Sequence, residues 1–347
     1  IGTIVLLNIP NIQQAMSVFV AEELSEVLNT KVVIGRINMG LLNRIIIDDV
    51  LLDDQSGQEM LKVTRLSAKF DIMPFFKGKI SISSVQLFGF NINLRKETPD
   101  SPPNFKFVLD AFASKDTVKK ENSLDLRINS ILIRRGRMSY HVLSEEETPG
   151  KFNAKHIQLQ NIIANISLKA LSKDSLNLGI KRLSLDEKAS GFSLKKMSLK
   201  LVANNKQTNI DNFTIELPET SLKLDTIHLE YDSLKAFDRF TEQVHFSFRT
   251  LPSQITLKDI SPFVPVLSHF KEPITLDMEV KGTVDQLNCS HLEIVSEEQQ
   301  FRLRGDVSLQ DLSHPQDAYV YGTLSELSAN TRGVGFLVRN LNPDYNG

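Results

Sequence analysis

Apolar and polar side chains alternate along most of the chain, and the alternation slips by one residue in the middle of each segment. The recurring unit has two alternating apolar positions, a gap of two residues, and two more alternating apolar positions. Strict alternation predicts a β-strand with one buried face, and one extra residue would turn every later side chain to the other face. A β-bulge restores the facing because it opposes two residues to one. We therefore predict bulged strands whose two halves present apolar side chains to the same side.

This unit occurs ten times, and four copies follow one another between Leu178 and Leu229. Three of these four supply the candidate residues for an apolar binding face: Leu178, Ile180, Leu183, Leu185, Phe192, Leu194, Met197, Leu199, Leu222, Leu224, Ile227 and Leu229. The other copies begin at Thr208, Ile45, Leu61, Ile80, Leu126, Ile157 and Leu287. A phase slip shared by ten segments indicates an internal repeat, in which stacked units bury an apolar face that none can bury alone.

The pattern predicts a mostly β fold: an elongated, curved antiparallel sheet of repeated bulged strands, shaped like a groove or a taco, with an N-terminal amphipathic helix. Residues 10–29 form that helix, 30–96 a first β-repeat section, 97–123 a linker with a short helix, and 124–347 a continued β-repeat section that is truncated at the C-terminus. Strands are expected to run to the end of the chain without a capping element.

Residues 1–9 are almost wholly apolar but too few to cross a hydrocarbon core, which requires about 20 residues. We interpret them as the end of a membrane anchor, with a buried edge strand as the alternative. After Pro10, an apolar stripe at helical spacing comprises Ile12, Met16, Phe19, Leu24, Val27 and Leu28. The polar face carries glutamates and no basic residue, so we expect this helix to cap the first repeats and not to lie on an anionic bilayer.

Composition excludes several classes of function. The net charge is −2, with 40 Lys and Arg against 42 Asp and Glu, which argues against a nucleic-acid partner. The single cysteine, Cys289, occupies an apolar repeat position and is expected to be buried. The seven histidines are dispersed along the chain, so we predict no metal site and no cofactor. No nucleophile elbow or phosphate-binding loop is present, and we expect a protein that is not an enzyme. The basic residues 134–137 are interpreted as a solvated strand end, with an anion site as the alternative.

The order of features up to about residue 113 resembles the N-terminal part of TamB-like translocation and assembly proteins of the AsmA/TamB family. The resemblance rests on a set of short segments: Ile9-Pro10-x-x-Gln13, Leu24-Ser25, Lys31-Val32-x-Ile34-Gly35, Ile46-x-Asp48-Asp49-Val50, Asp53-Asp54-Gln55-x-Gly57, Gly78-Lys79-Ile80-x-Ile82, Leu87-x-Gly89-x-x-Ile92-x-Leu94 and Pro103-Asn104-Phe105. Beyond residue 113 the likeness is one of architecture.

The resemblance implies a periplasmic protein anchored to the inner membrane through its N-terminus, with the architecture of bridge-like lipid transfer proteins. Its partners would be phospholipid, whose acyl chains an apolar groove carries toward the outer membrane, and an outer-membrane barrel of the assembly-factor type, reached through a C-terminal region that would follow Gly347. The family also assists outer-membrane protein assembly. From the residues alone, a closed β-sandwich or solenoid that serves as a protein-interaction module stays open, because a closed core and an open groove use the same apolar positions.

Overall fold

The computed structural model describes residues 10–40, 43–70, 80–113, 124–125, 129–172, 175–313 and 317–341. The expected membrane-anchor segment, residues 1–9, lies outside them. Strands hold 57% of the chain and helices 18%, which confirms the predicted mostly β fold with an N-terminal helix. None of the described helices is long and apolar enough to cross a membrane. The chain divides into two compact units, residues 1–167 with 184–191 and residues 168–183 with 192–347.

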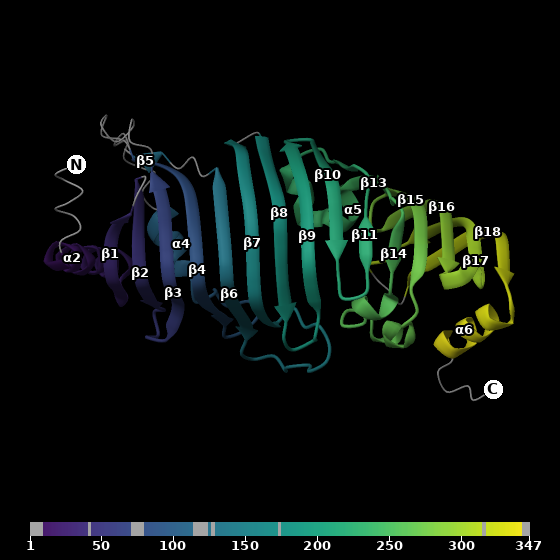
Figure 1. The fold of residues 1–347 in the computed structure, drawn as a ribbon, viewed down its shortest axis with the longest axis horizontal. Coiled ribbons are helices and arrows are strands. Elements are labelled where there is room, and N and C mark those ends of the chain that lie inside the picture. The colour runs from purple at the N-terminus through teal and green to yellow at the C-terminus, as the bar shows by residue number, and fades with distance from the viewer. Residues whose placement is uncertain are drawn as a thin grey trace. The chain divides into compact units, whose positions relative to one another are not determined.

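In the first unit the strands lie side by side in sequence order (Figure 1). Antiparallel pairs join β1 (Val32–Gly40) to β2 (Arg44–Asp53), β2 to β3 (Glu59–Phe70), β3 to β4 (Ile80–Lys96), and β6 (Ser130–Val142) to β7 (His156–Ser172). The pair of β4 with β6 is parallel, as is the short pair of β4 with β5 (Leu124–Asp125), so the expectation of a purely antiparallel sheet is wrong there. A parallel pair requires a long crossover, and the segment after Lys96 supplies it.

Two helices pack on the apolar face of the first unit. Helix α2 (Pro10–Leu28) and helix α4 (Lys106–Ala113) contact a cluster that includes Val32, Ile34 and Leu52. The buried positions of α2 are Gln13, Ser17 and Leu28, whereas Phe19 is 62% exposed and Val27 41% exposed. The predicted stripe is therefore partly wrong. The small side chain of Ser17 faces the sheet and bonds the Gln13 carbonyl through Oγ at 2.8 Å, which lets the helix approach closely.

The second unit is an antiparallel series from β9 to β18 with short helical insertions. Its elements are β9 (Ser193–Asn204), β10 (Gln207–Glu216), β11 (Ser221–Lys223), β12 (Ile227–Glu230), η1 (Leu234–Arg239), α5 (Phe240–Gln243), β13 (His245–Arg249), β14 (Ser253–Ile255), η2 (Leu257–Ile260), η3 (Pro265–His269), β15 (Ile274–Gly282), β16 (Gln286–Ser296), η4 (Glu297–Gln299), β17 (Phe301–Gln310), β18 (Tyr319–Ala329) and α6 (Thr331–Leu341). Strand β8 (Ser175–Glu187) contributes residues to both units.

The C-terminal helix α6 contradicts the expectation of strands without a capping element. Gly333 lies in its first turn, where a Cβ atom would come within 1.9 Å of the Gln300 carbonyl oxygen. Glycine therefore allows the helix to begin directly against the backbone that precedes β17. Sequence alternation carries no information about this close approach.

Two of the predicted bulges are present in the second unit, on β10 and β16. On β10, two residues between Asp211 and Thr214 oppose one residue of β9. On β16, two residues between Cys289 and Leu292 oppose one residue of β17. In each strand the residue just before the first apolar position after the slip has a positive φ. This residue is Asn212 (φ 53°), before Phe213, and His291 (φ 55°), before Leu292. Asparagine and histidine adopt this left-handed conformation more readily than most side chains.

In the first unit the slips of neighbouring strands lie at the same level. Ile47 pairs with Leu66 and Val50 with Val63, so the gap of β2 lies opposite the gap of β3. The gap of β3 in turn lies opposite Phe88 and Gly89 of β4, which are adjacent to Arg134 and Arg135 of β6. Because adjacent strands slip together, the ladder keeps its register and the apolar side chains of all of them stay on one face.

Candidate functional site

The apolar positions form rows that run across the strands. In the first unit one row joins Ile37, Ile47, Leu66, Leu87, Ile133 and Ala164 through successive register partners. A second row joins Val32, Leu52, Leu61, Ile92, Met138 and Leu159 in the same way. Helices α2 and α4 pack on the β1–β3 side of these rows. From β4 onward Leu87, Ile92, Ile133 and Met138 are half-buried, whereas Ala164 at the end of the first row is buried. This unit therefore has an apolar face that continues across its strands.

The second unit has the same kind of row, and it includes several of the candidate residues. Met197 of β9 pairs with Ile215 of β10, which pairs with Leu222 of β11. On the next level Leu201 pairs with Ile210, which pairs with Ile227 of β12. The fourth repeat copy is split, because β11 ends at Lys223 and β12 begins at Ile227, but both pieces bond the same strand β10.

Ten of the twelve candidate residues are half-buried, and Leu194 and Leu224 are buried, at 9% and 8% exposure. Leu178, Ile180 and Leu183 lie on β8 in the second unit. Leu185 belongs to the first unit and packs against its cluster of Val63, Phe90 and Ile162. The ring of Phe192 precedes β9 and packs edge-on against Phe263, with 5.0 Å between the ring centroids. Water thus reaches most of the candidate side chains in part, in contrast to the side chains of a dry core.

One buried cluster of the second unit lies beside its helical insertion. Tyr231, Ala236 and Val244 form a buried cluster around the η1–α5 insertion, and Leu229 is the only one of the twelve candidates that packs against it. The Tyr231 hydroxyl donates to the Asn204 carbonyl at 2.7 Å and lies 2.9 Å from Thr208 Oγ1, so the polar end of this ring is satisfied. The insertion therefore anchors one end of β10 and β12. The described residues place no comparable cluster over the row that contains Met197.

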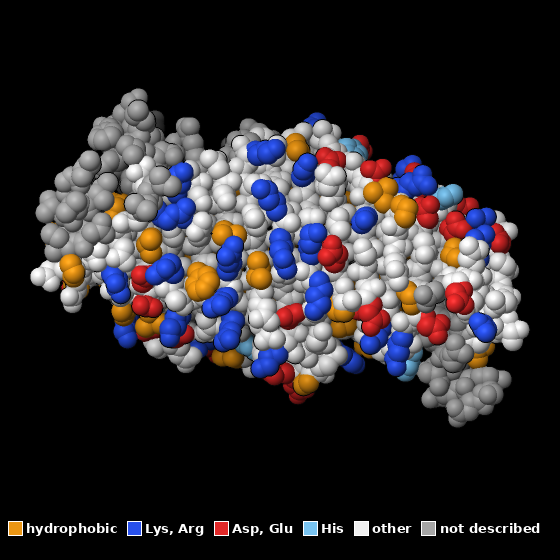
Figure 2. Space-filling model, viewed as in Figure 1, with side chains coloured by type: hydrophobic (Ala, Val, Ile, Leu, Met, Phe, Trp, Pro, Cys, Tyr) orange, Lys and Arg blue, Asp and Glu red, His pale blue; other side chains and the backbone are white. Residues whose placement is uncertain are grey.

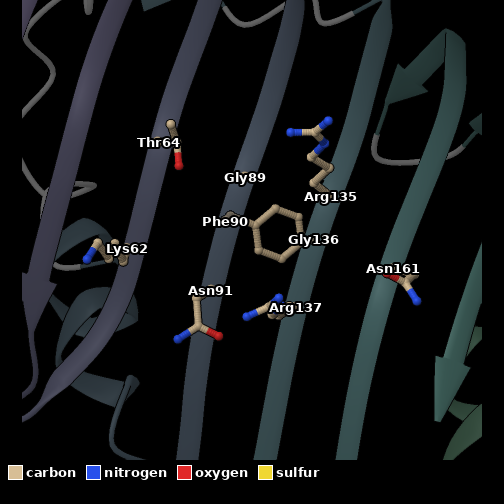
Figure 3. Close-up of a pocket in the computed structure, with 9 residues that line it drawn as sticks. All are labelled: Lys62, Thr64, Gly89, Phe90, Asn91, Arg135, Gly136, Arg137 and Asn161. Carbon is tan, nitrogen blue, oxygen red and sulfur yellow. The ribbon is translucent and has the colours of Figure 1, made fainter. Parts of the chain in front are cut away.

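The face drawn in Figure 2 is polar, and Lys and Arg side chains gather over its strands. In the first unit it contains a cavity of about 420 Å³ at the level of the gaps, shown in Figure 3. Lys62, Arg135 and Arg137 line this cavity together with amide, hydroxyl and glycine positions, and no carboxylate does. Residues 134–137 lie in the middle of β6, so the prediction that they end a strand is wrong. The three cations are exposed, which makes the cavity a solvated depression.

The ring of Phe90 explains why a glycine follows Arg134 and Arg135 in β6. Figure 3 shows the ring reaching from β4 to Gly136, and a Cβ atom at Gly136 would lie 2.4 Å from its nearest atom. Gly89 has a φ of 65°, and its Cβ atom would lie 2.7 Å from Thr64 Oγ1. Phe90 itself is 7% exposed. The gap level is thus closely packed toward the apolar face, while its polar side is hollow.

Two buried carboxylates fix the loops at one edge of the first unit. Burial favours a higher pKa for Glu187, but hydrogen bonds from Ser190 Oγ and from the backbone N–H groups of Gln158, Ser190 and Ala189 lower the pKa below its ordinary value. Burial likewise opposes ionisation of Asp54, and donors from residues 56, 58 and 104 lower its pKa. Both groups are therefore structural anions whose hydrogen bonds are satisfied.

Cys289 is buried, at 7% exposure, as predicted, and burial raises the pKa of its thiol. A thiol in this state is protonated and is a poor nucleophile.

Sequence reasoning missed one group of potential metal ligands. His141 and His156 are register partners on β6 and β7, and Glu147 from the loop between them completes a group of three side chains with converging ligand atoms. Fourteen residues separate the two histidines, so spacing could not reveal them.

Comparisons with known proteins identify no relative: no protein-family model matches the chain, and no curated protein matches it. The assignment of function therefore rests on the residues described above.

Proposed function

We propose that the apolar face of the repeats carries phospholipid acyl chains, as a non-enzymatic step in the biogenesis of a bacterial envelope. The observation that carries this proposal is the partial exposure of ten of the twelve candidate residues, of which Met197, Leu222 and Ile227 lie in apolar rows that cross the strands. A soluble protein rarely leaves a large contiguous apolar surface without an occupant. Aliphatic side chains would contact the acyl chains of a lipid and not its head group.

The energetic argument concerns the barrier to lipid movement. Transfer of one chain of about 16 methylenes into water costs about 13 kcal/mol at about 0.8 kcal/mol per methylene. A continuous apolar surface removes most of that barrier, whereas isolated apolar pockets would not. The rows run across the strands, so a chain lying along a row passes from strand to strand without leaving apolar contact.

The proposal places the protein in the AsmA/TamB family, in the periplasm, with an inner-membrane anchor that includes residues 1–9. Phospholipid is the cargo, and an outer-membrane barrel of the assembly-factor type is the partner at the far end. The resemblance of the first 113 residues supports these assignments. Assistance to outer-membrane protein assembly would use the same apolar face for unfolded strands.

Lipid analysis of the gently purified chain tests the proposal. We expect phospholipid to co-purify, as measured by mass spectrometry, with little head-group preference, and we expect the protein to bind added fluorescent phospholipid. Lipid-free, monodisperse protein that ignores added phospholipid would instead indicate a closed β-sandwich that serves as a protein-interaction module.

A further inference from the structure

A group of three potential metal ligands lies where β6 and β7 meet the loop between them. His141 and His156 are directly opposite in the antiparallel ladder. Their Nδ1 atoms are 3.0 Å apart, and His141 Nδ1 is 3.8 Å from Glu147 Oε1. One ligand atom from each of the three residues lies within 4.8 Å of the others. The side chains therefore converge on one point from two strands and a loop.

Hydrogen bonding fixes which nitrogen of His156 is available. His156 Nε2 lies 2.9 Å from the Glu145 carbonyl oxygen, and a carbonyl only accepts, so Nε2 carries the proton. In the neutral ring His156 Nδ1 then has a lone pair directed at His141, and it accepts a hydrogen bond from His141 Nδ1–H at 3.0 Å. An imidazole that donates its other N–H to a backbone carbonyl is the usual arrangement around a bound metal, because the bond orients the ring and makes the ligand nitrogen more basic.

The loop that bears Glu147 is held in place by other contacts. Lys155 and Glu145 form an ion pair at 2.7 Å, and Asn153 donates to the Glu146 carbonyl at 3.1 Å. His156 is 6% exposed, while the Glu147 side chain is 62% exposed. Two of the ligands are thus fixed by the strands, and the third can adjust its rotamer to close on an ion.

The distances suit a tetrahedral ion. Ligand atoms at about 2.0–2.2 Å from zinc at tetrahedral angles lie about 3.3–3.6 Å from one another. The two measured separations, 3.0 Å and 3.8 Å, fall on either side of that range. Two imidazoles and one carboxylate form a ligand set that binds zinc and leaves a fourth position for water or an outside ligand.

We propose that His141, Glu147 and His156 bind one zinc ion that ties the β6–β7 loop to its strands. Binding requires His141 to present Nδ1 without its proton, so that proton moves to Nε2 or to solvent when the ion enters. An ion that binds the folded chain and not the unfolded chain stabilises the folded state by mass action.

Zinc titration tests the proposal. The full chain is first freed of metal with a chelator, and zinc binding is then measured by competition with a chromophoric zinc indicator. We expect one zinc per chain and a rise in the melting temperature on zinc addition. His141→Gln and Glu147→Gln should each weaken zinc binding at least tenfold and abolish the rise. Glu147 is exposed on a loop, so its variant remains informative even where a histidine variant fails to fold.

His228→Gln is the matched control. His228 Nε2 lies 3.0 Å from Glu230 Oε1, which makes a histidine–glutamate pair, but these residues belong to no group of three ligands among the described residues. Zinc affinity and stoichiometry should be unchanged in this variant. Absence of stoichiometric binding to the wild-type chain, undiminished binding by Glu147→Gln, or an equal loss in His228→Gln would overturn the site.

Discussion

A charge placed on the apolar face separates a lipid-carrying surface from a closed core. The test substitutions are Leu183→Asp, Met197→Asp and Ile227→Asp, each at the first apolar position after a gap and each half-buried. Full burial of such a side chain is worth about 1.5–3 kcal/mol, so half-burial contributes about 0.8–1.5 kcal/mol. The new carboxylate keeps access to water, so its desolvation costs little free energy. We expect folded variants whose melting temperature falls by a few degrees.

Leu194→Asp on the same strand as Met197 gives the opposite expectation, because Leu194 is only 9% exposed. Truncation of a buried leucine costs about 2–5 kcal/mol, and a buried carboxylate without a partner adds several more. That sum approaches the whole stability of a typical domain, so this variant should unfold or aggregate. Lys195→Asp, at an exposed neighbouring position, controls for the charge change and should change stability by less than about 0.5 kcal/mol.

The assay is transfer of fluorescent phospholipid between vesicles, alongside far-ultraviolet circular dichroism and thermal melting. The three half-buried variants should stay folded and lose transfer, because a hydrated carboxylate interrupts the apolar row. The lysine control should keep both fold and transfer. Unfolding of all three half-buried variants would show a closed core, and full transfer by folded variants would show that lipid moves elsewhere.

Two further predictions concern the framework of the first unit. Glu187→Gln should lower the free energy of unfolding by about 1.5–3 kcal/mol at neutral pH, because hydrogen bonds to a charged group are lost. Folding lowers the pKa of Glu187, so the wild-type carboxylate stabilises the fold at pH values above its ordinary pKa of 4.5, and this stabilisation is lost as the pH falls through the folded-state pKa. In denaturation experiments at a series of pH values, the free energy of unfolding of the variant should therefore fall less steeply at acid pH than that of the wild type. Gly136→Ala should destabilise by about 1–3 kcal/mol through the clash with the Phe90 ring, and combination with Phe90→Leu should recover part of that loss in urea denaturation; strictly additive effects would contradict the packing argument.

Local patterns predicted the strands and the bulges of β10 and β16, because both are local properties of the backbone. In β2, β3, β4 and β6 the slips lie opposite one another and the register does not shift, so the prediction that two residues oppose one is wrong at that level. An asparagine, aspartate or histidine at the second gap position, as at Asp49, Asn161, Asn212 and His291, adopts the positive φ that the slip requires. Arg135 also has a positive φ, of 55°, although arginine has no such preference. At that position the neighbouring strands impose the conformation, and single-strand propensity could not predict it.

The features that sequence missed depend on contacts distant in the chain. The parallel pairing of β4 with β6 is decided by the path of the crossover after Lys96, not by the alternation within either strand. The pairing of His141 with His156 depends on the register of β6 and β7, in which the shifts on the two sides of Gly136 offset each other. The buried face of α2 was mispredicted because hydrophobicity favours Phe19, whereas the sheet accepts the smaller Ser17 at closest approach.

The aligned slips of the first unit explain both the continuous apolar rows on one face and the cavity on the other. A slip in one strand alone would leave its neighbour out of register, whereas slips at a common level in β2, β3, β4 and β6 keep every apolar row continuous. The same slips interrupt the ladder, and the interruption hollows the polar face into the cavity at Gly89 and Gly136. Rows that stay continuous from strand to strand are what an extended acyl chain would require, and they support the proposed lipid-carrying surface.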